Sequence, residues 1–186
     1  MRVIAGSARS LKLTTPKSNN TRPTTDRIKE TLFNILQPHL QGCTFLDLFA
    51  GSGGIGIEAL SRGAKKCVFV EKDSEALKCI KKNIESTGFT DKSMVISSDV
   101  FSALKNLPKG EGFDLIFMDP PYNKGLVISV LSAMSNSQIA NKNTIIVAET
   151  GLNEDIAEIE GFGYAIDRIK EYKTNKHWFI SKGDER

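Results

Sequence analysis

The sequence predicts a doubly wound α/β domain, in which helices cover both faces of a seven-stranded, mainly parallel sheet. The main observation is that short apolar runs alternate with segments of helical periodicity from residue 44 onward. A glycine-rich loop joins the first of these runs to a helix, and the last two runs are separated only by a turn. Because 186 residues are enough to bury one full core, we expect a single domain, residues 1–186.

The composition excludes several classes of protein. The longest apolar runs are strand-sized, well below the ~18 residues of a membrane span, and the first residues do not form a signal peptide, so the expected location is cytoplasmic. The cysteines are odd in number and lack metal-ligand spacing, and the two histidines are isolated. We therefore expect reduced core thiols and no metal site from these residues: Cys43, Cys67, Cys79, His39 and His177.

Residues 1–22 carry basic side chains and no acid, although the net charge of the chain is only +3. Apolar residues at Val3–Ile4 and at Leu11 and Leu13 flank a small turn and predict a β-hairpin extension, followed by a polar connector. An arm with one sign of charge favours a polyanion such as nucleic acid, although a solvated terminus has the same pattern. The cations are Arg2, Arg9, Lys12, Lys17 and Arg22.

A helix is expected at the start of the core, which we assign to residues 23–186. Thr24, Thr25 and Asp26 supply capping and first-turn chemistry. An apolar face then recurs at helical spacing, and Pro38 is expected to end the helix. The face consists of Ile28, Leu32, Ile35 and Leu36.

The first strand and its loop form the motif around which the core is organised. The run Phe45–Phe49 is apolar except for Asp47, and a glycine-rich turn follows, leading into a helix that ends near Gly63. Gly51, Gly53 and Gly56 match G-x-G-x-x-G, and Glu71 lies 20 residues after Gly51, so an NAD-dependent oxidoreductase is one interpretation. However, the Asp47 carboxylate repels a pyrophosphate and attracts the ammonium of a methionine moiety, which favours S-adenosylmethionine (SAM).

The βα alternation continues to the end of the chain. Helices are expected where Leu77, Ile80 and Ile84 share a face, from about Lys124 to Met134, and near Glu154–Glu158. The last two strands form an antiparallel hairpin that turns at residues 174–176. The expected strands are Cys67–Glu71, Met94–Asp99, Phe113–Met118, Thr144–Glu149, Tyr164–Tyr172 and His177–Ser181.

Acidic residues lie at the ends of successive strands. Beside Asp47, Glu71 is placed to accept the ribose hydroxyls of SAM and Asp99 to accept the adenine amino group, with Val100 against the face of the ring. Each acid alone is also typical of a solvated strand end. Because the carboxyl ends of parallel strands meet at one edge, the three together predict a ligand site there.

Asp119-Pro120-Pro121-Tyr122 follows the apolar run FDLIFM at the end of another expected strand. This DPPY sequence resembles the (Asn/Asp)-Pro-Pro-(Tyr/Phe/Trp) signature of those Rossmann-like class I SAM-dependent methyltransferases that modify exocyclic amino groups. A rigid turn with a surface tyrosine is the alternative interpretation. The position after a strand, downstream of the glycine loop, favours the methyltransferase.

Residues 22–36, RPTTDRIKETLFNIL, resemble the RPT-x-DR-(V/I)-x-E-x-LFN-x-L signature of the RsmD family. The basic hairpin beginning RVIAG, the segment LDLFAGSGGIGIEALSRGA and the DPPY sequence occur in the order of that family, which methylates a guanine N2 amino group in bacterial 16S ribosomal RNA. One departure is that Ser10-Leu11 stands where the family usually has Gly-Arg, so one basic RNA contact is in doubt, although Lys12 is a substitute.

The resemblance implies roles for individual residues. The Asp119 carboxylate and the Pro120 carbonyl are expected to accept the amino hydrogens, while the base stacks on Tyr122. The implied SAM site is Asp47, Phe49, Gly51, Gly53, Glu71, Asp99 and Val100. The implied RNA contacts are Arg2, Arg9, Lys12, Arg22 and Pro121.

The expected partner is 16S rRNA in the small ribosomal subunit or an assembly intermediate, with the protein acting as a monomer and without a metal. A DPPY enzyme acting on another base, such as adenine N6, remains an alternative. So does a non-catalytic RNA-binding assembly factor.

Overall fold

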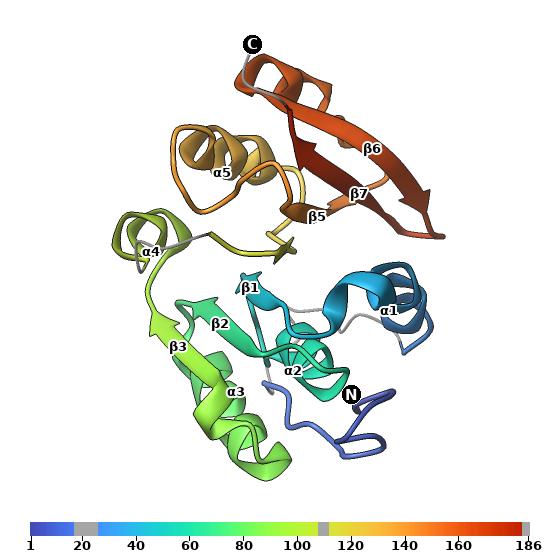
Figure 1. Ribbon diagram of the computed structural model, residues 1–186, viewed down its shortest axis with the longest axis vertical. Helices are drawn as coiled ribbons and strands as arrows, with labels where there is room; N and C mark the ends of the chain where they lie inside the picture. The colour runs from blue at the N-terminus through green and yellow to red at the C-terminus, as the bar shows by residue number, and fades with distance from the viewer. Residues whose placement is uncertain (17–25, 108–111, 184–186) are drawn as a thin grey trace.

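The computed structural model describes residues 1–16, 26–107 and 112–183, and in them one seven-stranded sheet has the order β3-β2-β1-β4-β5-β7-β6 (Figure 1). The strands from β1 to β5 pair in parallel, whereas β7 is antiparallel to both β5 and β6. The predicted fold is therefore confirmed. The bounds are β1 Thr44–Leu48, β2 Lys66–Glu71, β3 Ser93–Ser97, β4 Leu115–Met118, β5 Ile145–Gly151, β6 Tyr164–Glu171 and β7 Asn175–Lys182.

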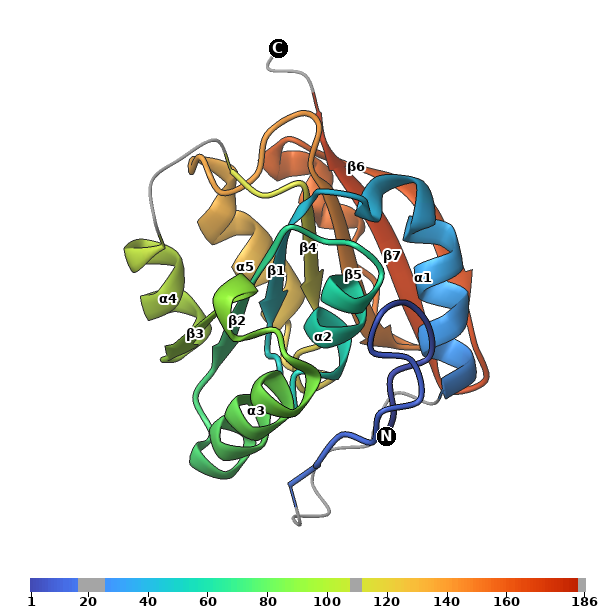
Figure 2. The ribbon, with the colours of Figure 1, turned by 60° about the horizontal axis from the view of Figure 1, so that its bottom comes forward.

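Two hydrophobic cores lie on the two faces of this sheet, because successive side chains of a strand point to opposite faces. On one face, Phe45 and Phe69 pack with α1 (Asp26–Leu40), α2 (Gly54–Ser61) and α3 (Ser74–Thr87). On the other face, Leu46 and Val68 pack with α4 (Val100–Asn106), α5 (Leu126–Ser135) and the 3₁₀ helix η2 (Ala157–Phe162). Figures 1 and 2 show the two groups of α-helices on opposite sides of the strands.

Several predicted boundaries were wrong. Helix α1 continues through Pro38 to Leu40, whose complete burial anchors the last turn despite the backbone hydrogen bond that proline cannot donate. The third strand ends at Ser97, and the helix expected near Glu154–Glu158 is the 3₁₀ helix η2 instead. Strand β7 begins at Asn175, so Asn175 and Lys176 lie in the strand and the turn precedes them. Helix α4 and the short 3₁₀ helix η1 (Thr90–Lys92) were not predicted.

The N-terminal segment turns back on itself, but the two strands of the expected hairpin are not formed. Within the described residues, its β structure is the single antiparallel bridge Arg2↔Lys12. The Val3 N–H donates to the Leu11 carbonyl over 2.9 Å, and Ser10 reverses the chain with a left-handed φ of 72°. The segment packs on α1 and α2 rather than extending the sheet, and Val3, Ala8 and Leu13 enter the first core.

Two kinds of feature are absent from the described part of the chain. None of its helices has the length and apolar character needed to cross a membrane. Nor do its histidine, cysteine and acidic side chains form a group of three that could hold a metal ion. Cys43, Cys67 and Cys79 are free and buried, which confirms the prediction of core thiols.

Candidate functional site

Three carboxylates gather at the carboxyl ends of the adjacent central strands β1, β4 and β5. Asp47 lies in β1 opposite Phe117, Asp119 follows the last residue of β4, and Glu149 lies in β5 one residue beyond the Ala148↔Met118 pair. Burial raises the pKa of Asp119 well above its usual value, and the nearby charges of Glu149 and Asp47 raise it further. This edge therefore brings three acidic groups together in an enclosed setting.

Asp47 is the most enclosed acid of the predicted cofactor site, with 1% of its surface exposed. Its Oδ2 accepts a hydrogen bond of 2.9 Å from the Gly56 N–H in the first turn of α2. Burial raises the pKa of Asp47 to about 7, the Gly56 N–H opposes this change, and the charge of Glu71 adds to it. A cationic ligand group beside Asp47 would favour the ionised carboxylate, as the ammonium of SAM requires.

The glycine loop between β1 and α2 has a left-handed backbone at several positions. Phe49 has a φ of 62°, which is unusual for a residue with a side chain, and Gly51 and Gly53 have φ values of 55° and 78°. A Cβ atom added at Gly51 would meet no atom within 4 Å, so the loop leaves open space there for a ligand to approach its backbone. By contrast, a Cβ at Gly56 would lie 2.3 Å from Phe69 and 2.6 Å from the Cys67 sulfur, so Gly56 allows α2 to pack on β2.

Glu71 ends β2 beside this loop, as predicted. One carboxylate oxygen accepts the Gly51 N–H over 2.8 Å, and the other accepts the N–H groups of Lys72 and Asp73, each over 2.8 Å. Since each carboxylate oxygen has more than one acceptor position, Glu71 can hold the loop and still accept a ribose hydroxyl. The residues present thus fit SAM.

Asp99 and Val100 lie at the start of α4. The Asp99 side chain caps this helix by accepting the Ser102 N–H over 3.0 Å, and the hydrogen bonds from Ser102 lower its pKa. Val100 is only 6% exposed and packs in the second core, whereas its neighbour Phe101 is 36% exposed. Phe101 directly follows the predicted residues Asp99 and Val100. It was not predicted to be an exposed neighbour of them because helix α4 was not expected.

The DPPY segment follows β4, and its tyrosine is held by a buried network. Pro120 is buried, while Pro121 and Tyr122 are exposed. The Tyr122 hydroxyl donates to Glu149 Oε1 over 2.5 Å, and the same oxygen accepts the Asn175 side-chain N–H over 2.7 Å.

His177 completes this network through a 2.8 Å contact between its Nε2 and Glu149 Oε2. Burial alone would raise the pKa of Glu149, but the hydrogen bonds from His177, Tyr122 and Asn175 hold it below its usual value. Sequence reasoning missed Glu149 and His177 as site residues. The antiparallel register that places them opposite one another is visible only in the folded sheet.

The predicted RNA-contacting residues lie mainly on the N-terminal segment. Arg9 and Lys12 are exposed, and exposed Arg2 forms an ion pair with Asp26 over 2.9 Å. Leu11, at the position where the family usually has arginine, is 42% exposed. Arg22 lies outside the described residues.

Comparison with known proteins places the chain in a family. The family model described as conserved hypothetical protein 95 matches residues 1–180. The chain belongs to this family, the RsmD family that the motifs predicted. YlbH of Bacillus subtilis is 41% identical over 162 residues, which cover 87% of this chain and 88% of that protein.

Two further similarities extend this result. The ribosomal RNA small subunit methyltransferase D of Haemophilus influenzae is 39% identical over 151 residues, covering 81% of this chain and 78% of that protein. The solved structure of the yhhF protein of Escherichia coli has a TM-score of 0.87 at 29% identity and covers 100% of this chain and 99% of that one. The chain therefore has the class I methyltransferase fold, and the family match extends over residues 1–180.

Proposed function

We propose that this protein methylates the exocyclic N2 amino group of a guanine in 16S rRNA, within the small ribosomal subunit or one of its assembly intermediates. SAM is the cofactor and would supply an electrophilic methyl group and leave as S-adenosylhomocysteine, while the proton lost from the amino nitrogen passes to water or to the Asp119 carboxylate. Relatives named ribosomal RNA small subunit methyltransferase D support an rRNA substrate. The observation that carries the proposal is the position of Asp119, which follows β4 beside the carboxylates of Asp47 and Glu149.

The guanine N2 lone pair is delocalised into the ring, so the amino group needs help to become nucleophilic. Acceptors that bind both amino hydrogens hold the nitrogen and favour its pyramidal form as the new bond develops. The carboxylate of Asp119 and the backbone carbonyl of Pro120 are the acceptors in this proposal. The two consecutive prolines restrict the backbone, so the carbonyl keeps its direction.

Tyr122 offers an exposed ring on which the base stacks. The amino edge of guanine is covered in a paired helix, so the base must come from a loop or leave its stack before reaching Asp119. Stacking on an aromatic side chain contributes roughly 1–3 kcal/mol per base, which offsets part of the cost of unstacking. The hydrogen bond to Glu149 keeps the ring in one orientation.

The cofactor residues bind and orient rather than react. Asp47 provides a charge for the methionine ammonium, Gly51 leaves its backbone accessible, and Glu71 accepts ribose hydroxyls. Asp99 and Val100 are assigned to the adenine, and the exposed ring of Phe101 lies next to them. The basic N-terminal segment docks the RNA backbone through Arg9 and Lys12.

The test is incubation of the protein and labelled SAM with small subunits that lack the modification, followed by nucleoside analysis. N2-methylguanosine is expected, whereas N6-methyladenosine would assign the enzyme to another base. Naked 16S rRNA, tested in parallel, identifies which form is the substrate. Absence of any methylated nucleoside, with the Asp119→Ala variant as the blank, would contradict the proposal and favour an assembly factor.

A further inference from the structure

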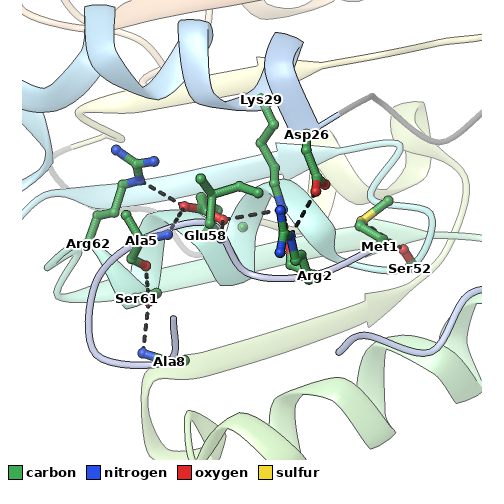
Figure 3. Close-up of polar contacts among 12 residues, drawn as sticks. Met1, Arg2, Ala5, Ala8, Asp26, Lys29, Ser52, Glu58, Ser61 and Arg62 are labelled. Carbon is green, nitrogen blue, oxygen red and sulfur yellow. Dashed lines mark hydrogen bonds and ion pairs between the residues drawn. The ribbon is translucent and has the colours of Figure 1, made fainter. Parts of the chain in front are cut away.

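The N-terminal segment, residues 1–14, is bound to α2 (Figure 3). This helix follows the glycine loop between β1 and α2, residues 49–53, which is called the cofactor loop below. The centre of the attachment is Glu58 on α2, whose side chain is fully buried. A carboxylate removed from water in this way must be surrounded by donors and opposite charge. Its partners, at 2.8 to 3.2 Å, are the backbone N–H groups of Ile4 and Ala5 and the side chains of Lys29 and Arg62.

Ser61, one turn further along α2, provides a second attachment. Its hydroxyl accepts the Ala8 N–H over 3.0 Å and donates to the Ala5 carbonyl over 2.5 Å, and its own carbonyl accepts the Ser7 N–H over 2.8 Å. A Cβ at Gly6 would lie 1.8 Å from that carbonyl oxygen. The segment therefore lies directly against the helix backbone.

Asn83 joins the end of this segment to the cofactor loop itself. It lies on α3 and is 1% exposed. Its side-chain oxygen accepts the Thr14 N–H over 2.7 Å, and its side-chain nitrogen donates to the carbonyls of Thr14 and Ser52, over 2.8 and 2.9 Å. Ser52 lies between Gly51 and Gly53, so one amide group holds both the N-terminal segment and the middle of the loop.

Met1 makes a separate contact with the same loop. The Ser52 hydroxyl donates to the Met1 sulfur over 3.9 Å, and a Cβ at Gly54 would lie 2.2 Å from that sulfur. The Met1 carbonyl also accepts the Leu13 N–H over 3.0 Å, so the two ends of the segment lie side by side, with Met1 against the loop. A displacement of the segment therefore acts on the loop at two points.

We propose that Asn83 is a positioning residue that couples the N-terminal segment to the cofactor loop, so that RNA and cofactor strengthen each other's binding. The identity of the two ligands rests on the proposed function. Because Asn83 holds both Thr14 and Ser52, a shift of the segment on RNA binding is passed to the middle of the loop, and cofactor that binds the loop favours the same position of the segment. Such coupling is reciprocal, because each ligand must change the affinity of the other by the same factor.

The test measures binding rather than turnover, with S-adenosylhomocysteine as an unreactive probe. Calorimetry of the wild type should show at least about 5-fold tighter probe binding in the presence of unmodified small subunits. Asn83→Leu keeps the branched shape of the side chain but removes its hydrogen bonds, so this factor should fall well below the wild-type value, with the Met1 contacts left in place. Asn106→Leu is the matched control and should leave the factor unchanged, because among the described residues the Asn106 side chain donates to the Ser102 carbonyl within α4 and to no group of the segment or the loop.

Thr14→Pro provides an independent variant if Asn83→Leu unfolds. It removes the N–H that Asn83 accepts and leaves the loop sequence intact, so it should also weaken the coupling. Wild-type coupling in either folded variant would overturn the inference. If the wild type forms N2-methylguanosine but binds the probe equally with and without subunits, the inference fails while the proposed function stands.

Discussion

The hydroxyl of Tyr122 donates to Glu149 Oε1 over 2.5 Å, which ties the ring proposed to receive the target base to a buried carboxylate of β5. Because His177 and Asn175 hold the same carboxylate, the ring is oriented by a network that extends into β7. The tyrosine hydroxyl therefore has a role separate from the stacking surface.

Tyr122→Phe should lie between the wild type and Tyr122→Ala in single-turnover methylation of small subunits. Phenylalanine keeps the ring but loses a hydrogen bond to a charged group, worth about 1.5–3 kcal/mol when both partners are enclosed and less here because Tyr122 is partly exposed. Thermal unfolding of each variant gives the accompanying change in stability. Equal rates for Tyr122→Phe and Tyr122→Ala would mean that the ring itself contributes nothing.

Glu149→Gln should shift the acidic limb of the pH–rate profile to lower pH. The charge of Glu149 is one of the causes that raise the pKa of Asp119, so its removal lowers that pKa and keeps Asp119 ionised in more acidic solution. The shift is expected even if the maximal rate falls through the loss of an acceptor for Tyr122. Glu154→Gln is the control, since Glu154 accepts the nearby Asn123 N–H but is not among the charges acting on Asp119.

Affinity for SAM should rise with pH through the titration of Asp47. Its pKa in the free protein is about 7, so below that pH the carboxyl is largely protonated and binding of the ammonium must release a proton. Calorimetry in buffers of different ionisation enthalpy measures this release, which should be absent in Asp47→Asn.

The raised pKa of Asp47 also makes the stability of the folded protein depend on pH. Because the folded-state pKa of Asp47 lies above the unfolded value, the folded state binds more protons between about pH 4 and pH 7. Stability is therefore lost as the pH rises through this window, and Asp47→Asn should reduce that loss, while Asp119, whose pKa is also raised, continues to contribute to it. Denaturant unfolding of the unliganded protein at several pH values checks this, and an unchanged pH dependence in the variant would contradict the assignment.

Asp119→Ala should reduce turnover more than it reduces the affinity for either substrate. The contact to the amino hydrogens matters most as the nitrogen changes shape, so its loss should appear mainly in the rate, on the order of 100-fold. Asp119→Asn keeps the size and one acceptor oxygen and should retain more activity than alanine. Near wild-type methylation by Asp119→Ala would favour the interpretation of the DPPY segment as a structural turn.

Replacement of Arg9 and Lys12 by alanine should flatten the salt dependence of RNA binding. Each phosphate contact that is lost should reduce the slope of log affinity against log salt by about 0.7–0.9. Glu58 and its partners contact the segment elsewhere, so affinity for S-adenosylhomocysteine alone should be unchanged. Complete deletion of residues 1–14 is a poor substitute for this double variant, because it also removes the contact of Met1 with Ser52 and the hydrogen bonds of Thr14 with Asn83. If the salt dependence of RNA binding equals that of the wild type, RNA binds to a surface that does not include Arg9 and Lys12.

The parts of the fold that depend on local pattern were predicted well from the sequence. Strands buried on both faces appear as apolar runs, and acids such as Asp47, Glu71 and Asp119 at the ends of parallel strands lie at one edge of the sheet. The glycine loop was recognisable because a left-handed backbone needs glycine at positions such as Gly51 and Gly53.

The parts that depend on tertiary contacts were not predicted. His177 faces Glu149 only through the register of β7 on β5, and Asn83 reaches Ser52 from a different helix, so neither pairing has a local signal. Helix α4 is too short for its periodicity to be recognised. Helix α1 passes Pro38 because the burial of Leu40 outweighs the local effect of proline.

The close packing at Gly56 gives the molecule an internal chemical reporter. The Cys67 thiol lies beneath Gly56, is fully buried, and has a pKa well above its usual value, mainly because of burial. A thiol reagent therefore reaches it only after α2 lifts from β2, and its reaction rate counts those openings. The Gly56 N–H also donates to Asp47, so the alkylation rate of Cys67 measures how often the contact between α2 and the Asp47 carboxylate opens.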